Sequence, residues 1–288
     1  MTEENPDAEV PAWRRNAPLA AGIVVLAAVA FAAWQWLLPE APPEVSKPPA
    51  APRATLAPPP PPPEPAIVNP VEVPTDAPGA PTAADLESTL MALAGAGTVQ
   101  SLFRLQDLPR RIVATIDSLG RAQASASLSP LIPPRGNFST ERSGEAEVIA
   151  STNFVRYAKY VAMLEAIDTA AAATAYRRLY PVLQRAYEDL GFPGKYFNDR
   201  LVAVIDLLLA TPSPPGPLRV RLPEFGVDMK PERPWVLYQY EDPALQQLSA
   251  GQRMLLRMGP DPMRRVKAKL KEIRAQVAAT PTPPALTR

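Results

Sequence analysis

The stretch YRRLYPVLQRAYEDLGFPGKYFNDRLVAVID, residues 176–206, decides the fold of the chain. Its apolar and aromatic residues recur every three or four positions, which is the spacing of one face of an α-helix. The residues expected to face inward are Tyr176, Leu179, Tyr180, Leu183, Tyr187 and Leu190. Gly191 ends this helix, and Asn198 or Asp199 begins the next one. Pro181 interrupts the pattern and is expected to kink the first helix or divide it in two.

Helical signals continue on both sides of this stretch. Earlier in the chain, Ser151 or Thr152 can cap a helix, and two further helices are expected at 85–95 and 109–120, each ended by glycine. Later in the chain, Asp242-Pro243 and Asp261-Pro262 each place a capping residue before a proline, which predicts two more helical starts. The expected fold class is therefore mainly α, with a compact multi-helix domain over residues 85–279.

Short strands are expected in two places. The segments on either side of Ser143-Gly144 can form a small hairpin, with a mobile loop as the alternative. Leu218–Leu222 alternates apolar and basic residues, and Trp235–Tyr240 is rich in residues that favour strands, so these two runs can pair in antiparallel fashion. The domain is thus expected to carry one or two short β-hairpins.

An uncharged apolar stretch, APLAAGIVVLAAVAFAAWQWLL, occupies residues 17–38. It is long enough to cross a bilayer as a helix, and Arg14 and Arg15 just before it predict a cytoplasmic N-terminus. The expected location is therefore the bacterial inner membrane, crossed once, with the C-terminal domain in the periplasm. Alternatives are a cleaved signal peptide, for which Ala30-Phe31-Ala32 resembles a cleavage site, and a buried helix of a soluble protein.

Three segments are expected to be disordered: the polar tail 1–16, the proline-rich linker 39–84 and the tail 280–288. Proline lacks the N–H that helices and sheets require, so the linker favours an extended polyproline conformation. We expect it to serve as a spacer between the membrane and the domain. The alternative is a ligand for a proline-recognising domain.

Composition excludes several kinds of chemistry. The chain has no cysteine and no histidine, which removes disulfides, thiol nucleophiles and the commonest metal ligands and general bases. No phosphate-binding glycine motif is present. The net charge of +1 gives no argument for nucleic acid. No cofactor, metal or nucleic-acid partner is expected.

Three runs of the sequence carry a family resemblance. They are NFVRY at residues 153–157, the stretch 176–206 quoted above, and LSAGQRMLLRMGPDPMRRVKAKLKEIR at residues 248–274. Together they strongly resemble the bacterial domain of unknown function 3014 family. The resemblance implies one N-terminal membrane helix, a proline-rich linker and a mainly helical domain in the cell envelope. It carries over no catalytic residue, and the stretch 223–234 is longer than the family leads one to expect.

The middle of the chain is rich in tyrosine and arginine, which are favoured on binding surfaces. The candidate binding surface comprises Arg156, Tyr157, Tyr176, Tyr180, Asn198, Asp206 and Arg257. Packing in the core with the hydroxyl groups hydrogen-bonded would explain the tyrosines equally well.

A second candidate surface is the basic face of the last helix, formed by Arg264, Arg265, Lys267, Lys269, Lys271 and Arg274. It could bind anionic lipid or an acidic wall polymer. The alternative is a solvated face of a helix whose apolar side packs on the domain.

Three aspartates follow isoleucine within apolar runs, at Asp117, Asp168 and Asp206. Gathered in one cleft they could act as acid and base in a hydrolase of cell-envelope material. The alternative is that each aspartate flanks the apolar stripe and pairs with an arginine such as Arg156, Arg177 or Arg257, or with a tyrosine hydroxyl. The function expected first is a non-catalytic binding or scaffolding module whose partner is an envelope protein or a cell-wall component.

Overall fold

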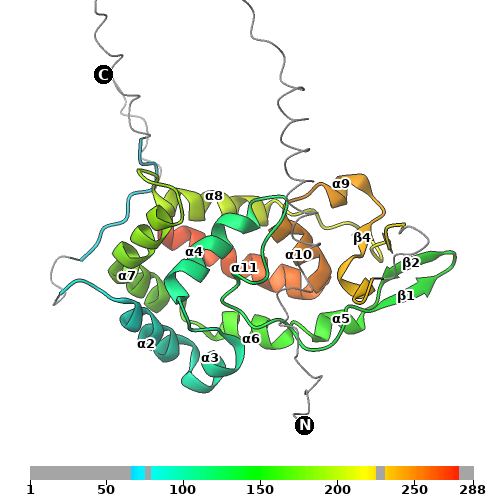
Figure 1. Cartoon of the computed structure of the whole chain (residues 1–288), viewed down its shortest axis with the longest axis horizontal. Helices are drawn as coiled ribbons and strands as arrows, with labels where there is room; N and C mark the ends of the chain where they lie inside the picture. The colour runs from blue at the N-terminus through cyan, green and yellow to red at the C-terminus, as the bar shows by residue number, and fades with distance from the viewer. Residues whose placement is uncertain (1–65, 75–78, 225–230, 279–288) are drawn as a thin grey trace, which may run out of the picture. The chain divides into compact units, whose positions relative to one another are not determined.

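The computed structural model describes residues 66–74, 79–224 and 231–278, all of which belong to the unit Pro62–Arg288 (Figure 1). The predicted tails 1–16 and 280–288 and the predicted membrane segment 17–38 lie outside the described residues. None of the described helices is both long enough and apolar enough to cross a membrane.

The described residues form a mainly α domain with ten α-helices, which confirms the expected fold class. The helices are α2 (Ala83–Ala94), α3 (Ala96–Leu102), α4 (Leu108–Leu119), α5 (Thr152–Val155), α6 (Ala158–Ala166), α7 (Thr169–Asp189), α8 (Phe197–Leu209), α9 (Pro243–Gln246), α10 (Ala250–Met258) and α11 (Pro260–Val277). A 3-10 turn, η2, covers Pro234–Val236.

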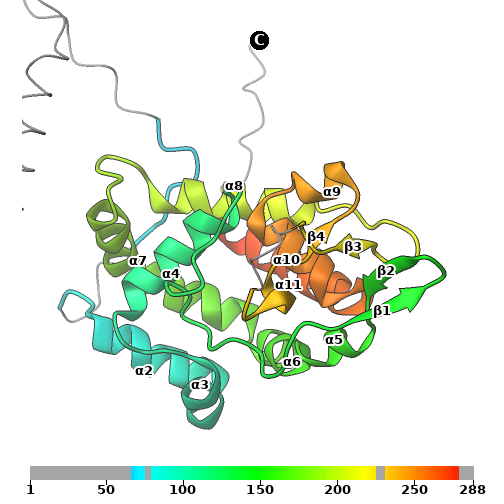
Figure 2. The ribbon, with the colours of Figure 1, turned by 45° about the vertical axis from the view of Figure 1, so that its right-hand side comes forward.

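Two short antiparallel hairpins accompany the helices, as the sequence predicts. Strand β1 (Thr140–Ser143) pairs with β2 (Ala146–Ile149), and Gly144 makes the turn with a positive φ of 62°. Strand β3 (Val220–Arg221) pairs with β4 (Gln239–Tyr240). A bridge between Val148 and Arg219 places the two hairpins side by side (Figure 2).

Helix boundaries differ from expectation where a cap or a turn was misassigned. Thr82, and not Asp85, caps α2, and Asp85 completes a reciprocal capping box from inside the first turn. The helix expected after Ser151 is divided at Arg156 and Tyr157 into α5 and α6. The helix carrying Pro181 remains a single element, α7, and Pro181 itself is exposed.

Helix α11 organises the packing, because it contacts α6, α7, α8 and α10 (Figure 1). The core forms two clusters of buried apolar side chains. The first includes Val161, Val204, Tyr240, Leu255 and Met258, and the second includes Leu108, Leu179, Tyr180, Tyr187 and Phe197. Ile116 of α4 packs against both clusters and so joins them. Burial of each large apolar side chain stabilises the fold by about 1.5 to 3 kcal/mol.

Residues 66–74, which we call the strap, precede α2 and are hydrogen-bonded to the start of α8. They fall within the span 39–84 that the sequence predicts to be disordered linker. The folded domain therefore begins ahead of Asp85, the start expected from sequence.

Candidate functional site

Arg156 lies where α5 ends and α6 begins. Its guanidinium donates from Nε to the carbonyl of Arg135 at 3.2 Å, from Nη2 to the carbonyl of Gly136 at 2.8 Å, and from Nη1 to Oδ1 of Asn153 at 3.2 Å. All three acceptors are neutral. These bonds hold the loop at 135–136 against α5 and leave the charge of Arg156 uncompensated by a carboxylate.

Arg257, on α10, reaches the same region from a different helix. Its Nη2 donates to the carbonyl of Tyr238 at 2.7 Å. Its guanidinium carbon lies 5.5 Å from the ring centre of Phe138 and 6.0 Å from that of Tyr240, which are cation–π distances. Within the described part of the chain, neither Arg156 nor Arg257 forms an ion pair.

Tyr157 connects the two arginines. Burial raises the pKa of its hydroxyl, and the positive charges of Arg156 and Arg257 both oppose that rise. Both guanidinium groups are therefore close enough to act on one phenol. We name this group the arginine–tyrosine site, and it consists of Phe138, Arg156, Tyr157, Tyr238, Tyr240 and Arg257.

One carboxylate adjoins this site and is hydrogen-bonded to one of its tyrosines. Glu147, on β2, accepts hydrogen bonds at Oε1 from the hydroxyl of Tyr238 at 2.6 Å and from the hydroxyl of Thr140 at 2.5 Å. The rings of Tyr238 and Phe138 pack at 5.6 Å between centres. The two arginines of the site lie against aromatic rings, and neither of them binds this carboxylate.

We expect the domain to lose stability in alkaline solution because Tyr240 is buried as the neutral phenol. Burial raises the pKa of Tyr240 to about 12, against about 10 for the unfolded chain, and nearby Arg257 opposes the rise. The folded state therefore holds this proton more tightly, and the resulting stability is complete below about pH 10 and is lost between about pH 10 and 12. Denaturant unfolding followed across this range should show a falling midpoint. The Tyr240→Phe variant should show a shallower fall, and an identical slope in both proteins would contradict the prediction.

The rest of the predicted binding surface lies in two other places. Tyr176 donates its hydroxyl to Oδ1 of Asn198 at 2.9 Å, and Tyr180, which is buried, accepts from the backbone N–H of Asn198 at 3.3 Å. This group holds the strap. Asp206 lies on α8 and pairs with Arg274. The structure therefore brings together Arg156, Tyr157 and Arg257, and separately Tyr176, Tyr180 and Asn198.

The three predicted aspartates are each held by a different contact. Asp117 is buried and pairs with Arg200 at 2.9 Å and Arg121 at 2.5 Å. Asp168 caps α7 by accepting from the backbone N–H of Ala171 at 2.7 Å. Oδ2 of Asp206 accepts a hydrogen bond from Nη2 of Arg274 at 3.0 Å. Asp117 and Asp206 do pair with arginines, as the alternative interpretation predicts. Their partners are Arg121, Arg200 and Arg274, none of which is among the arginines suggested by the sequence.

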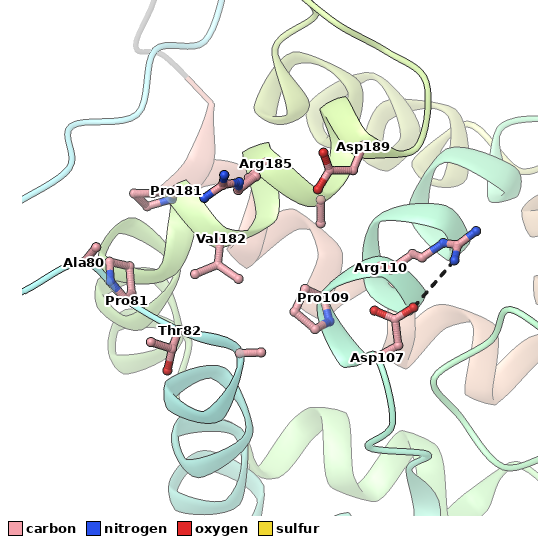
Figure 3. A pocket seen from close by; sticks show the side chains of 12 residues that line it. Ala80, Pro81, Thr82, Asp107, Pro109, Arg110, Pro181, Val182, Arg185 and Asp189 are labelled. Carbon is pink, nitrogen blue, oxygen red and sulfur yellow. Dashed lines mark ion pairs between the residues drawn. The ribbon is translucent and has the colours of Figure 1, made fainter.

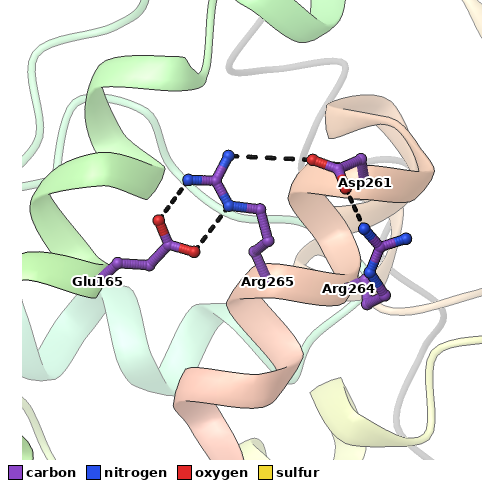
Figure 4. A network of polar contacts seen from close by, with 4 residues as sticks. All are labelled: Glu165, Asp261, Arg264 and Arg265. Carbon is purple, nitrogen blue, oxygen red and sulfur yellow. Dashed lines mark hydrogen bonds and ion pairs between the residues drawn. The ribbon is translucent and has the colours of Figure 1, made fainter.

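The basic residues of α11 are largely engaged within the domain. Arg265 binds Glu165 of α6 through both Nε, at 2.7 Å, and Nη2, and Arg264 pairs with Asp261 (Figure 4). Lys267 donates to the carbonyl of Thr211 at 2.5 Å, and the buried Lys269 pairs with Glu272 at 3.1 Å. Arg274 binds Asp206, so among the six described cations of this face Lys271 is the one without a hydrogen bond or ion pair.

Two hollows lie apart from the arginine–tyrosine site. One, of about 420 Å³, opens between the starts of α2 and α4 and the middle of α7, and its rim carries Asp107, Arg110, Arg185 and Asp189 (Figure 3). None of the predicted site residues lines it. The other, of about 680 Å³, lies between α11 and the turn before α7, and it brings Asp168 and Lys269 together. No group of acidic side chains suited to a metal ion occurs in the described ranges.

Sequence reasoning missed Phe138 and the two tyrosines of the second hairpin as members of the site. The sequence does contain a signal, since the run at 235–240 includes three aromatic residues. The strand pattern accounts for the run without assigning these residues to a binding site. Sequence reasoning also missed the strap. There the signal is the apolar pair Ile67-Val68 followed by asparagine, inside a segment otherwise dominated by proline.

Comparison with known proteins gives one match. A family model described as "Protein of unknown function (DUF3014)" matches residues 108–274, which include α4 through most of α11 and all of the arginine–tyrosine site. Neither the curated proteins nor the solved structures contain a match to this chain.

Proposed function

We propose a function from the geometry of the domain, because this chain belongs to the family described as "Protein of unknown function (DUF3014)", whose description assigns no activity. The function is that of a non-catalytic binding or scaffolding module. Its binding surface is the arginine–tyrosine site, and its partner is an envelope protein that presents clustered carboxylates. The alternative of an acidic wall component shares the same chemistry and is separated from it by the experiment below.

The observation that carries this proposal is the pair of arginines without carboxylate partners. A partly buried guanidinium loses hydration, and that loss is best offset by a carboxylate bound through two parallel hydrogen bonds. Arg257 donates to the carbonyl of Tyr238 and lies beside Tyr240, and within the described residues it binds no carboxylate. Tyrosine and arginine are also the residue types that contribute most to protein interfaces.

The surroundings of the pair favour a protein partner. Aromatic rings flank Arg257 on two sides, and the side chain of Val155 next to Arg156 is 75% exposed. An interface of this kind combines apolar contact at the centre with charged groups that fix the orientation. A polymer carrying only charge would use the arginines and leave Val155 in water.

The predicted anchor and spacer fit this function. A membrane helix at 17–38 and a proline-rich linker would hold the domain in the periplasm at a limited distance from the inner membrane. Tethering of this type raises the effective concentration of the domain near partners in the same compartment. The supporting observation is the sequence of residues 1–65.

Site-directed crosslinking in cells tests the proposal. A photo-crosslinking residue in place of Val155 should capture one recurrent envelope protein through a segment rich in Asp and Glu. The double change Arg156→Gln and Arg257→Gln should reduce that product at least tenfold, because two charge-assisted hydrogen-bonding groups are lost. The readout is mass spectrometry of the crosslinked peptides.

Two controls make this experiment decisive. The change Arg185→Gln with Lys271→Gln removes the same charge from two exposed cations outside the site and should leave the product unchanged. A crosslinker in place of the exposed Ala203 on α8 should not give the product. Equal losses in both double variants, or capture of wall fragments alone, would overturn the proposal.

A further inference from the structure

The backbone of the strap is held by one carboxylate. Asp199, in the first turn of α8, accepts the backbone N–H of Val68 at 3.1 Å and that of Asn69 at 2.6 Å. It also accepts from Nδ2 of Asn69 at 3.0 Å. A single side chain therefore binds two successive backbone N–H groups and also the side-chain amide of Asn69.

Two neighbouring residues complete the contact. Asn198, which is fully buried, donates from Nδ2 to the carbonyl of Asn69 at 2.9 Å. The hydroxyl of Tyr196 accepts the backbone N–H of Val71 at 2.7 Å. We call Tyr196, Asn198 and Asp199 the clamp, and it lies where the strap passes the start of α8 (Figure 2).

The strap turns two of its side chains, those of Asn69 and Val71, toward the domain. Asn69 is buried, and the side chain of Val71 packs against the second core cluster. Ile67, Val68 and Val73 point outward and are 54%, 69% and 40% exposed. The contact therefore recognises a backbone that bends at Val68 and Asn69, with asparagine at one position and a small apolar residue two positions later.

We propose that the clamp is a binding site for a peptide of the pattern Asn-x-Val, and that two copies of the chain exchange their straps through it. The occupant is the strap of a second copy, because every copy of the chain carries the sequence that fits the clamp. Exchange replaces each hydrogen bond within a copy by the same hydrogen bond between copies. The number of hydrogen bonds is therefore unchanged. The outward direction of three apolar side chains means that little apolar surface holds the strap in place. The proposal is independent of the arginine–tyrosine site.

A pair of complementary variants tests exchange in the full chain. The first, Asp199→Ala, has an intact strap and a damaged clamp. The second, Asn69→Ala with Val71→Ser, has an intact clamp and a damaged strap. Neither can close its own contact, but the strap of the first can bind the clamp of the second. Co-expressed with different tags, the two should co-purify at least tenfold better than either does with a tagged copy of itself.

The matched self-pairs remove other causes of association. Contacts through residues 1–65 are present in every combination, so they raise all three recoveries equally. Recovery of the mixed pair at the level of the self-pairs would overturn the exchange. Circular dichroism of each variant checks that the helices are retained, and Asp199→Asn replaces the alanine variant if they are not.

A peptide measurement tests the clamp separately. A fluorescent peptide of residues 66–74 should bind the variant with the damaged strap in a saturable manner, measured by anisotropy. Binding to the Asp199→Ala protein, and binding of a peptide with Asn69→Ala, should each be at least tenfold weaker. Failure of the peptide to bind the folded strap variant would overturn the assignment of the clamp as a site.

Discussion

Replacement of Gly259 by alanine is expected to lower the free energy of unfolding by about 2 to 6 kcal/mol. Gly259 links α10 to α11 with φ of 90° and ψ of 167°, a conformation that only glycine adopts without strain of about 1 to 3 kcal/mol. A Cβ at this position would also overlap the ring of Phe154, and overpacking of this kind costs about 1 to 3 kcal/mol more. Denaturant unfolding measures the sum of the two effects.

Gly191 provides the matched control for this prediction. It follows α7 with φ of 107°, but a Cβ there would meet nothing within 4 Å. The Gly191→Ala variant should therefore lose only the conformational part, about 1 to 3 kcal/mol. Similar losses in the two variants would show that Phe154 does not press against the junction of α10 and α11.

The second large effect is expected at Asp117. The Asp117→Asn variant should lose about 2 to 3 kcal/mol, because Arg200 and Arg121 would both lose the buried carboxylate that balances their charge. Breaking a fully buried pair costs about 3 to 5 kcal/mol. The expected loss is smaller here because the side chain of Arg121 is 54% exposed, and water screens its attraction to the carboxylate of Asp117.

A double-mutant cycle with Arg200→Gln separates the pair from other effects of the substitution. Arg200 also donates to the backbone carbonyl of Asp117 at 2.6 Å and lies against Gly120, so its own removal loosens the end of α4. The cycle should give a coupling of at least 1 kcal/mol. Asp206→Asn breaks the exposed pair with Arg274 and should cost less than about 1 kcal/mol. A larger loss at Asp206 than at Asp117 would contradict the prediction.

Local signals predicted most of the fold. Gly95 and Gly120 end α2 and α4, and Asp242-Pro243 begins α9, because helix caps and stops depend on a few adjacent residues. The turn at Gly144 was predicted for the same reason. Ser249 and Gln252 form a capping box that divides α9 from α10, and this local signal was overlooked.

The partners of charged and polar residues could not be predicted in this way. The cations of α11 pair with α6 and α8, which are distant in sequence, so their spacing alone indicates a free basic face. The tyrosines of the middle of the chain divide between two sites for the same reason. Asn198 is the extreme case, since its four hydrogen bonds connect the strap, α7 and the end of α11.

Asn198 also determines how the folded chain closes on itself. The same Nδ2 atom donates to the carbonyl of Asn69, near the beginning of the domain, and at 2.8 Å to the carbonyl of Val277, at its end. The entry and exit of the domain are therefore neighbours, as in domains that tolerate circular permutation. A short peptide could join them and new ends could be opened at the exposed turn of Gly144, or the whole domain could be inserted into a surface loop of a host protein without stretching either chain.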